Sequence, residues 1–493
     1  MSCPDFFCKF RAKILMSYVT IHLRYFILNV NYKQNIRRFH IMKIIVNGCG
    51  KIGTTILANL VGEGHDVTII DTNPTTIERL TNIYDVIGVC GNGADSDLLQ
   101  EASVGDNDLF ISTADSDEKN MLACFFAKRL GVNNTVARIR NPEYNDKSLS
   151  FIRNNLEISL TINPELMTSQ ELFNILRLPS AAKVVNFSVR NFEIVEFKIK
   201  EGSLLDGLKV SEIRNKFKSK FLVCAVQRGE EAFIPGGNFI LQAGDKIGVT
   251  ASLGEIIRLF KELDMKKSSA KKVMILGGSK TAVFLAKKLQ DADIDVTIIE
   301  KNKARCEELT EDLPKALVVC GDCSSQELLI EEGLLATDAV IALTGLDELN
   351  VLISSYASSQ KVPKVIAKIS RPELIPLSEH WGLDTIVSPR KSVANTVVRY
   401  ARALANSQGS GVETLYKLMD DKVEALEFIA KKELDILDIP FKELKLKPNI
   451  LIAGIVRNRK IIVPTGSDAI TAGDRVVVFS TNHGINDLAD IAE

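Results

Sequence analysis

The sequence predicts an α/β protein made by tandem duplication, in which each copy holds a doubly wound parallel sheet followed by a small α+β domain. Three observations predict this fold. A glycine-rich turn joins a short apolar strand to an apolar helical pattern within residues 43–61. Short apolar strands then alternate with helical segments, which is typical of a parallel sheet covered by helices. The same order of segments returns about 229 residues later, where Lys272 takes the position of Lys43.

The glycine-rich turn is the most informative stretch of the chain. Gly48, Gly50 and Gly53 stand at the G-x-G-x-x-G spacing, and Cys49, Lys51 and Ile52 fill the positions between them. In a Rossmann-type domain the first glycine allows the tight turn, the second lets a pyrophosphate approach the backbone, and the third lets the helix pack on the strand. The free N–H groups at the start of the helix then bind phosphate. The turn therefore predicts a nucleotide site.

A carboxylate follows at the place where a ribose would lie. The predicted strand at 67–70 ends in Asp71, which is 18 residues beyond Gly53. A carboxylate at this position accepts hydrogen bonds from the ribose hydroxyls. It would also repel a 2′-phosphate, so NAD is favoured over NADP. Asp71 does not distinguish NAD from ATP, since both carry a ribose diol; the alternative is a surface carboxylate in a loop.

Three further candidates follow the later strands of the sheet. Asn92 and Thr113 come just after the third and fourth predicted strands, and Arg138 closes the fifth. Open α/β sheets bind ligands at the carboxyl edge of their strands. Asn92 would meet the adenine or ribose, and Thr113 the phosphate side. For both residues, a role in a turn or a helix cap is an equal alternative. Arg138 would bind phosphate, because a guanidinium forms paired hydrogen bonds with it. The alternative for Arg138 is an ion pair with Asp115 or Asp117.

The order of the predicted strands and helices indicates that each copy contains two domains. The first part holds strands at 44–46, 67–70, 86–89, 109–112 and 135–138, with a helix at 119–130. The second part holds short β-type runs at 184–189, 194–198, 221–228, 231–235 and 246–251, with a helix at 253–263. The predicted domains are 42–160, 180–265, 271–392 and 410–493, and a polar linker at 265–271 joins the two copies.

Composition excludes several classes of protein. The chain has 493 residues, 46% apolar and 25% charged, and a net charge of −1, so no nucleic-acid footprint is visible. Nine scattered cysteines argue against a disulfide framework. No charge-free apolar run reaches 18 residues, so no membrane span is expected. Neither the histidines nor Cys320-x-x-Cys323 show a metal-ligand pattern, and no metal is expected.

Residues 1–41 differ from the rest of the chain. They hold seven Lys and Arg residues against a single acid, Asp5, together with many aromatic side chains. A basic amphipathic segment at a membrane surface and a targeting peptide are two interpretations. The favoured interpretation is that this leader does not belong to the fold and that the start was misassigned upstream of Met42, one residue before the first strand.

The second copy departs from the first at its glycine turn. Ser279 takes the place of the second glycine and Ala282 that of the third, whereas Glu300 keeps the ribose carboxylate. A side chain at position 279 crowds the space where a pyrophosphate would lie. We therefore expect a weakened or altered nucleotide site, with a purely structural turn as the slightly favoured alternative.

These motifs resemble the TrkA family, the regulatory subunits of Trk potassium uptake, which carry two regulator-of-potassium-conductance (RCK) units. The residues that carry the resemblance are the glycine turn at 48–53, Asp71, the segments 90–93, 116–120 and 137–140, and the Ala-Gly-Asp turns at 243–245 and 472–474. The resemblance implies a peripheral cytoplasmic protein that binds NAD(H), with ATP or ADP as alternative ligands. It also implies a homo-oligomer, a tetrameric ring, that gates a membrane potassium-translocating subunit of the TrkH or TrkG type.

An NAD-dependent oxidoreductase is the competing prediction, because the same fold hosts many such enzymes. An enzyme of this kind needs a proton donor or acceptor beside the nicotinamide. The sequence has no Tyr-x-x-x-Lys pair, and His65 lies in a segment remote from the expected nicotinamide end. We therefore expect a ligand sensor without catalytic residues rather than an enzyme.

Overall fold

The computed structural model describes residues 41–493 apart from 142–143, 145, 178–182, 187–192, 266–269, 384, 408–411, 420–421, 459, 483–484 and 486. The basic leader, most of the predicted linker and the end of the strand predicted at 184–189 lie outside the described residues.

The first copy opens with a six-stranded parallel sheet in the order β3-β2-β1-β4-β5-β6. This is the strand order of a Rossmann-type fold. The strands are β1 (Lys43–Asn47), β2 (Asp66–Asp71), β3 (Ile87–Cys90), β4 (Leu109–Ser112), β5 (Asn134–Arg138) and β6 (Leu160–Ile162). The helices between them are α2 (Lys51–Gly62), α3 (Pro74–Ile83), α4 (Ser96–Glu101), α5 (Asp117–Arg129) and α6 (Asp146–Leu156). The predicted fold class is confirmed, although the sixth strand was not predicted.

The second copy repeats this sheet strand for strand, in the parallel order β14-β13-β12-β15-β16-β17. The strands are β12 (Lys272–Leu276), β13 (Asp295–Glu300), β14 (Leu317–Cys320), β15 (Ala339–Ala342), β16 (Lys364–Lys368) and β17 (Ile386–Val387). The helices are α10 (Lys280–Asp291), α11 (Lys303–Asp312), α12 (Gln326–Glu331), α13 (Asp347–Ser359) and α14 (Leu374–His380).

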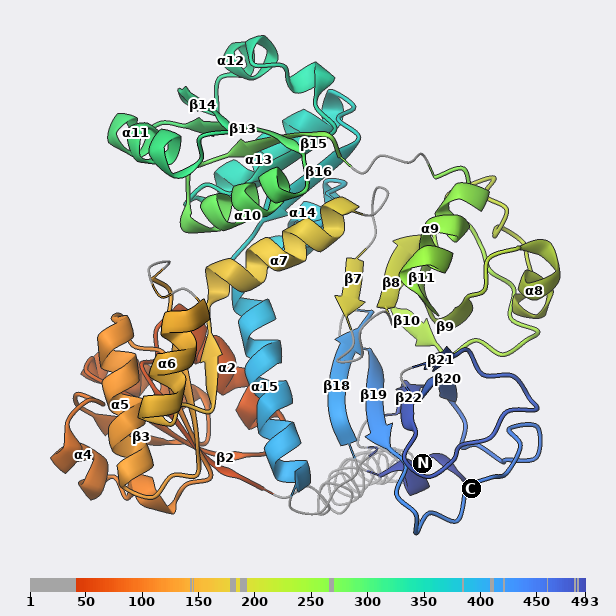
Figure 1. Cartoon of the computed structure of the whole chain (residues 1–493), viewed down its shortest axis with the longest axis horizontal. Coiled ribbons are helices and arrows are strands. Elements are labelled where there is room, and N and C mark those ends of the chain that lie inside the picture. Colours follow the sequence, from red (N-terminus) through yellow and green to blue (C-terminus); the bar gives the residue numbers. More distant parts are fainter. Residues whose placement is uncertain are drawn as a thin grey trace, which may run out of the picture.

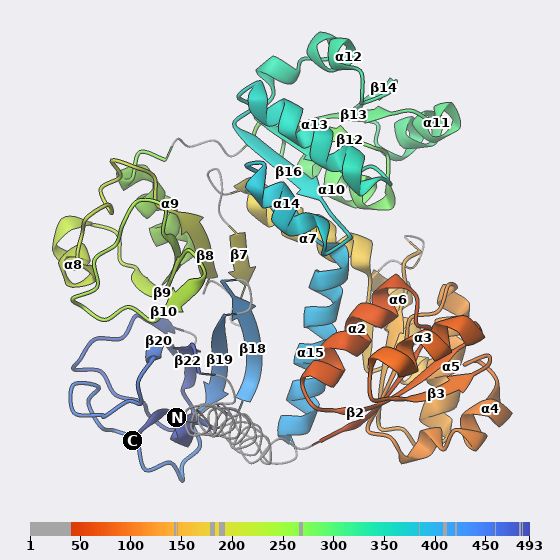
Figure 2. The same ribbon diagram turned by 180° about the vertical axis from the view of Figure 1, so that it is seen from behind.

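Each copy also holds a small five-stranded antiparallel sheet, ordered β10-β9-β11-β8-β7 in the first and β18-β19-β22-β20-β21 in the second. The first contains β7 (Lys183–Asn186), β8 (Glu193–Lys198), β9 (Leu222–Arg228), β10 (Glu231–Phe233), β11 (Lys246–Ala251), α8 (Ile213–Lys216) and α9 (Leu253–Glu262). The second contains β18 (Val412–Leu418), β19 (Val423–Ile429), β20 (Ile450–Arg457), β21 (Lys460–Ile462) and β22 (Arg475–Ser480). The two small domains lie side by side (Figures 1 and 2) and share a buried cluster.

The repeated turns of the small domains have one structural role. Arg228 holds Asp245 of the first Ala-Gly-Asp turn through two bonds of 2.8 Å, Nε to Oδ1 and Nη2 to Oδ2. Arg457 holds Asp474 of the second turn in the same way, at 2.9 and 2.7 Å. These two-pronged arginine–carboxylate pairs fix the turn before β11 and before β22. The same arginine and aspartate recur 229 residues apart because they form the same ion pair in both small domains.

Each copy contributes the helix that follows its parallel sheet to the core of the other copy. The sequence did not predict this exchange. Helix α15 (Pro389–Ser407) follows the second parallel sheet, yet its buried Val393, Val397 and Ala401 belong to the core around α2 of the first copy. Helix α7 (Pro164–Arg177) follows the first sheet, yet its Leu172 and Ile175 join the core around α10 of the second. Figure 1 shows α15 beside α2 and α7 beneath α10. Each parallel-sheet domain is therefore completed by a helix from the other copy.

Polar contacts support this exchange. The guanidinium of Arg402 in α15 pairs with the carboxylate of Glu63, the residue that ends α2, and both side chains are nine-tenths buried. In the reciprocal contact, Nζ of the buried Lys364 in β16 donates to the carbonyl of Ile175 near the end of α7, at 2.7 Å. The cation thus meets the negative end of the helix dipole.

Lys364 predicts a measurable pH dependence of stability. Burial lowers the pKa of Lys364 from 10.5 to about 8, so between these values the unfolded chain binds more protons than the folded protein. The free energy of unfolding should therefore rise with pH in this window, by roughly 3 kcal/mol from this group. Urea unfolding at about pH 7.5 and about pH 10 should show the rise in the wild type and lose it in Lys364→Met. Equal changes in both proteins would contradict the assignment.

Candidate functional site

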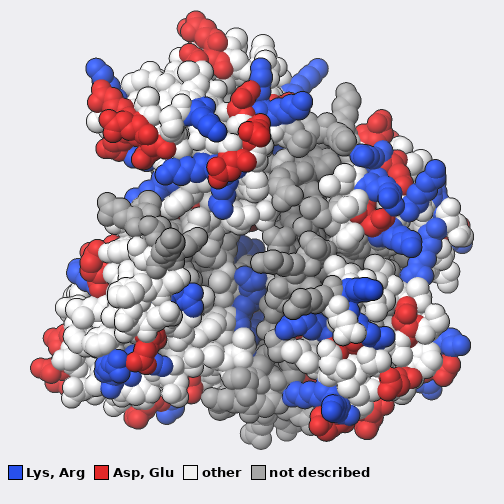
Figure 3. All heavy atoms as spheres, in the orientation of Figure 1, with Lys and Arg blue, Asp and Glu red and all other residues white. Residues whose placement is uncertain are grey.

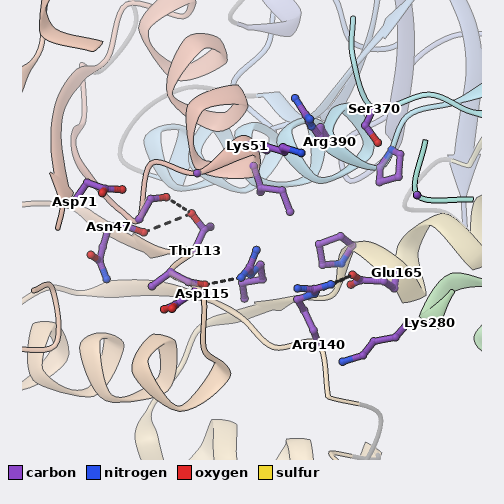
Figure 4. A pocket seen from close by; sticks show the side chains of 18 of the residues that line it. Asn47, Lys51, Asp71, Thr113, Asp115, Arg140, Glu165, Lys280, Ser370 and Arg390 are labelled. Carbon is purple, nitrogen blue, oxygen red and sulfur yellow. Dashed lines mark hydrogen bonds and ion pairs between the residues drawn. The ribbon is translucent and has the colours of Figure 1, made fainter. Parts of the chain in front are cut away.

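A cleft of about 1420 Å³ lies between the two parallel-sheet domains. The first copy lines it with the ends of β1, β2, β4 and β5, and the second with the start of α10 and the loops after β15 and β16. The carboxyl edges of the two sheets thus face one another. Figure 4 shows Lys51, Asp71 and Thr113 of the first copy across from Lys280, Ser370 and Arg390 of the second. The cleft is where open α/β sheets bind their ligands.

Eight of the predicted site residues line this cleft, namely Gly48, Gly50, Lys51, Ile52, Asp71, Asn92, Thr113 and Arg138. Three do not. Cys49 is buried beneath the turn, Gly53 lies within the first turn of α2, and the Glu300 carboxylate accepts a hydrogen bond from the second glycine turn. A ligand role for each of these residues stays a prediction.

The three glycines of the first turn meet different physical demands. Gly48 has φ +84°, and a Cβ there would lie 2.5 Å from the Ala114 nitrogen. A Cβ on Gly53 would lie 2.0 Å from the Gly48 carbonyl oxygen, so α2 packs directly against the turn. A Cβ on Gly50 would meet nothing within 4 Å. Gly48 and Gly53 are therefore required by the fold, whereas Gly50 borders open space at the start of α2.

Replacing Gly53 with alanine should destabilise the first copy. The new methyl group would overlap the Gly48 carbonyl, and overpacking of this kind costs about 1–3 kcal/mol. A thermal melt followed by circular dichroism should show a lower melting temperature for Gly53→Ala than for Gly62→Ala, since Gly62 lies in the same helix with open space around it. A Gly53→Ala protein as stable as its control would contradict this close packing.

A buried polar network fixes the strand ends beneath the cleft. Asn47 Nδ2 donates to Ser112 Oγ at 2.9 Å, and Ser112 Oγ donates to Asn120 Oδ1 at 2.8 Å. Asn120 Nδ2 donates to the Arg138 carbonyl at 2.9 Å. Thr113 Oγ1 donates to the Gly48 carbonyl at 2.7 Å, which ties β4 to the glycine turn. Thr113 thus has a structural role as well as its place in the cleft.

Asp71 and Asn92 hold the ribose side of the cleft in shape. Asp71 Oδ2 accepts the Cys49 N–H at 2.7 Å, and its Oδ1 accepts the Asn73 N–H at 2.9 Å. Each carboxylate oxygen keeps a second lone pair for a hydroxyl group. Asn92 Oδ1 accepts the Ala94 N–H at 3.1 Å, so the predicted turn role of Asn92 is present.

Arg138 is poised for an anion. Among the described residues it forms no ion pair within 4 Å, so neither Asp115 nor Asp117 is its partner. Its Nη2 donates to the Ala114 carbonyl at 2.5 Å, and its Nε is buried without a hydrogen-bond partner. Burial, and then the neighbouring charge of Arg140, lower the pKa of Arg138. A phosphate in the cleft would supply the negative charge that Arg138 lacks.

The cleft gathers further basic side chains from both copies. Its lysines and arginines are Lys51, Lys119, Arg138, Arg140, Lys280, Lys368, Arg371 and Arg390. Three of them pair with carboxylates: Lys119 with Asp115 at 3.2 Å, Arg140 with Glu165, and Arg371 with Glu348. Within the described part of the chain, the other five form no ion pair within 4 Å. Figure 3 shows basic side chains along the lower edge of the second parallel-sheet domain, toward the first.

The second glycine turn is closed by its own residues. Ser279 is the N-cap of α10, and its Oγ accepts the Ala282 N–H at 3.4 Å, whereas Gly50 gives α2 no side-chain cap. Glu300 Oε2 accepts the Gly278 N–H at 2.6 Å, as Asp71 does for Cys49. The side chain of Ser279 thus accepts one of the free N–H groups at the start of α10, whereas no side chain does so at the start of α2.

Sequence reasoning missed the residues that the second copy brings to the cleft. Lys280 repeats Lys51 at the offset of 229, and Lys368 repeats Arg138 at 230, so the repeat preserved both charges. Burial lowers the pKa of Lys368, as it does for Arg138. Arg140 lies two residues beyond the end of β5 and also lines the cleft. The repeated basic residues could be read from the sequence. Nothing in the sequence showed that the carboxyl edges of the two sheets face each other.

The fold and the cleft together define the class of protein. The chain carries two Rossmann-type domains, one from each copy, and both line one basic cleft. The TrkA-N domain model matches residues 44–157 and 273–389, and the TrkA-C domain model matches 194–264 and 426–492. The chain belongs to the TrkA family of Trk system potassium uptake proteins. The family predicted from the sequence motifs is therefore confirmed.

The relatives match nearly the whole chain. The Trk system potassium uptake protein TrkA of Vibrio alginolyticus is 31% identical over 444 residues, which is 90% of this chain and 96% of that protein. A TrkA homologue of Archaeoglobus fulgidus is 30% identical over 450 residues, 91% of this chain and 100% of that protein.

Solved structures share the fold at low sequence identity. The GsuK channel bound to NAD has a TM-score of 0.59 and 16% identity, covering 90% of this chain and 77% of that one. The GsuK RCK domain has the same TM-score with 15% identity, covering 90% and 93%. The described helices include none that is long and apolar enough to cross a membrane.

Proposed function

We propose that this chain is a regulatory subunit of Trk-type potassium uptake that senses a nucleotide in the cleft between its two parallel-sheet domains. The observation that carries the proposal is a set of five cations that have no carboxylate partners among the described residues and that line the same cleft as the open start of α2. Lys51, Arg138, Lys280, Lys368 and Arg390 form this set. Their arrangement suits a ligand that carries two or more phosphates.

NAD(H) is the ligand we favour, with ADP and ATP as alternatives. Gly50 leaves room for a pyrophosphate at the helix start, and Asp71 lies at the edge where ribose hydroxyls would be accepted. Arg138 and Lys51 would hold the phosphates from the first copy. A structural neighbour of this chain was solved with NAD bound, which supports the dinucleotide.

The proposed output is control of a membrane partner. The family's name points to potassium uptake, and we infer a TrkH- or TrkG-type translocating subunit as the partner. The chain would act from the cytoplasmic face as a homo-oligomer, in a tetrameric ring. Because both copies line one cleft, a ligand held between them would favour one relative position of the two domains. A ligand shifts such an equilibrium only by its difference in affinity for the two states.

We propose no enzymatic activity. His65 lies just before β2, at the amino edge of the sheet and away from the cleft, and Cys49 is buried with its pKa raised to about 12 by burial. Neither is placed to exchange protons with a nicotinamide. Oxidation of NADH by the purified chain with any carbonyl substrate would instead favour the oxidoreductase alternative.

Calorimetric titration of NADH, NAD, ADP and ATP into the full chain tests the proposal. We expect a dinucleotide or adenine nucleotide to bind with a stoichiometry near one per chain, because only the first glycine turn leaves its helix start open. We also expect NADPH to bind more weakly than NADH, since Asp71 would repel its 2′-phosphate. Absence of heat with all four nucleotides would overturn the assignment.

A further inference from the structure

Two cysteines of the second copy meet at the end of its sheet, outside the cleft. Cys306 lies in α11 and is buried, and its Sγ lies 3.3 Å from the Glu300 carbonyl oxygen. Glu300 is paired in register with Cys320, the last residue of β14. Cys320 is exposed, and both thiols are free. The backbone thus brings a buried and an exposed thiol to one point.

The strand alternation places both thiols on the same face of the sheet. Val318 packs into the cluster that contains Leu309 of α11, whereas Val319 packs on the opposite face against Leu329 of α12. Side chains two apart on a strand share a face, so Cys320 points toward α11 with Val318. Burial, and then a hydrogen bond to Cys320, raise the pKa of Cys306 to about 11.

The first copy lacks this pair, although it keeps the exposed thiol. Cys90 ends β3 as Cys320 ends β14, and its Sγ lies 3.9 Å from the Thr72 carbonyl. The position that corresponds to Cys306 in the first copy is Ile77, in α3. The duplicated chain therefore provides its own single-thiol control.

We propose that Cys306 and Cys320 form an oxidant-sensitive dithiol site that closes to a reversible disulfide. The exposed Cys320 thiolate would attack a peroxide, giving a sulfenic acid and one water. The Cys306 sulfur would then attack the Cys320 sulfur and displace a second water, so that two thiols and one hydrogen peroxide give one disulfide and two waters. Burial keeps Cys306 from the oxidant, so the oxidant reaches the exposed Cys320 first.

The position of this site gives the bridge a structural consequence. Glu300 lies between the two cysteines, and its carboxylate holds the Gly278 N–H of the second glycine turn at 2.6 Å. A disulfide would tie α11 to the strand end beside that turn. This inference does not depend on a nucleotide in the cleft, because neither cysteine lines it.

Peptide mapping of the full chain tests the proposal. The protein is treated with hydrogen peroxide, its free thiols are alkylated, and it is cleaved without reductant after Arg305 and Lys315 and before Asp322, so that Cys320 and Cys323 fall in different peptides. We expect a crosslink between the Cys306 and Cys320 peptides that dithiothreitol removes. It should be lost in Cys306→Ser and in Cys320→Ser and kept in Cys323→Ser and Cys90→Ser. A crosslink through Cys323, or an alkylated Cys306 after oxidation, would overturn it.

Discussion

Replacing Gly50 with valine should weaken nucleotide binding by at least about 100-fold, or about 2.7 kcal/mol. The new side chain would fill the open space at the start of α2 where a pyrophosphate has to reach the backbone N–H groups. It would meet no protein atom within 4 Å at its Cβ, so the fold should survive. Calorimetric titration measures the affinity, and circular dichroism checks the fold.

The matched control is Gly62→Val. Gly62 ends the same helix, also has open space around it, and lies at the opposite end from the cleft. The same substitution there should leave affinity within about twofold of the wild type, since it touches no part of the proposed site. If Gly50→Val bound NADH as tightly as Gly62→Val, the glycine turn would have no part in binding.

Replacing Arg402 with alanine should have the largest effect on stability. The change removes the guanidinium from the buried Glu63 carboxylate at the junction of α15 and α2, and breaking a buried pair in this way costs about 3–5 kcal/mol. The first copy should lose the helix that completes its core, so urea unfolding should begin at lower concentration. Far-ultraviolet circular dichroism against urea measures the change.

An exposed pair of the same chemistry is the control. Arg129 and Glu157 are bonded at 2.8 Å, but both side chains are about half exposed, so Arg129→Ala should cost less than about 1 kcal/mol. Removing both buried charges with Glu63→Leu and Arg402→Met should recover part of the loss. Equal midpoints for Arg402→Ala and Arg129→Ala would show that the pair does not hold the exchanged helix.

The duplicated fold was predictable because local patterns determine it. The apolar run at 44–46 and the glycine turn specify β1 and α2 without distant contacts. The exchange of α7 and α15 was not predictable in this way. Val393, Val397 and Ala401 mark an apolar face on α15, but a face shows only that a helix is buried, not which of two similar cores receives it. The short β6 and β17 were missed, since three and two residues give no periodic signal.

The candidate site was predictable to the extent that it lies on one copy. Spacing alone placed Asp71, Thr113 and Arg138 at one sheet edge, and the cleft contains all three. The contribution of Lys280 and Arg390 depends on how the two copies pack, which follows from the exchanged helices. The open environment of Gly50 and the buried Nε of Arg138 are properties of the packed structure that the sequence does not display.

Potassium flux tests the central claim most directly. Vesicles that carry the translocating subunit from the same genome would be supplied with wild-type chain or with Gly50→Val, and uptake would be recorded with and without NADH and ATP. The account predicts that nucleotide changes flux several-fold with the wild-type chain and has no effect with Gly50→Val, although both chains bind the vesicles equally. A nucleotide response of the same size with Gly50→Val would contradict it.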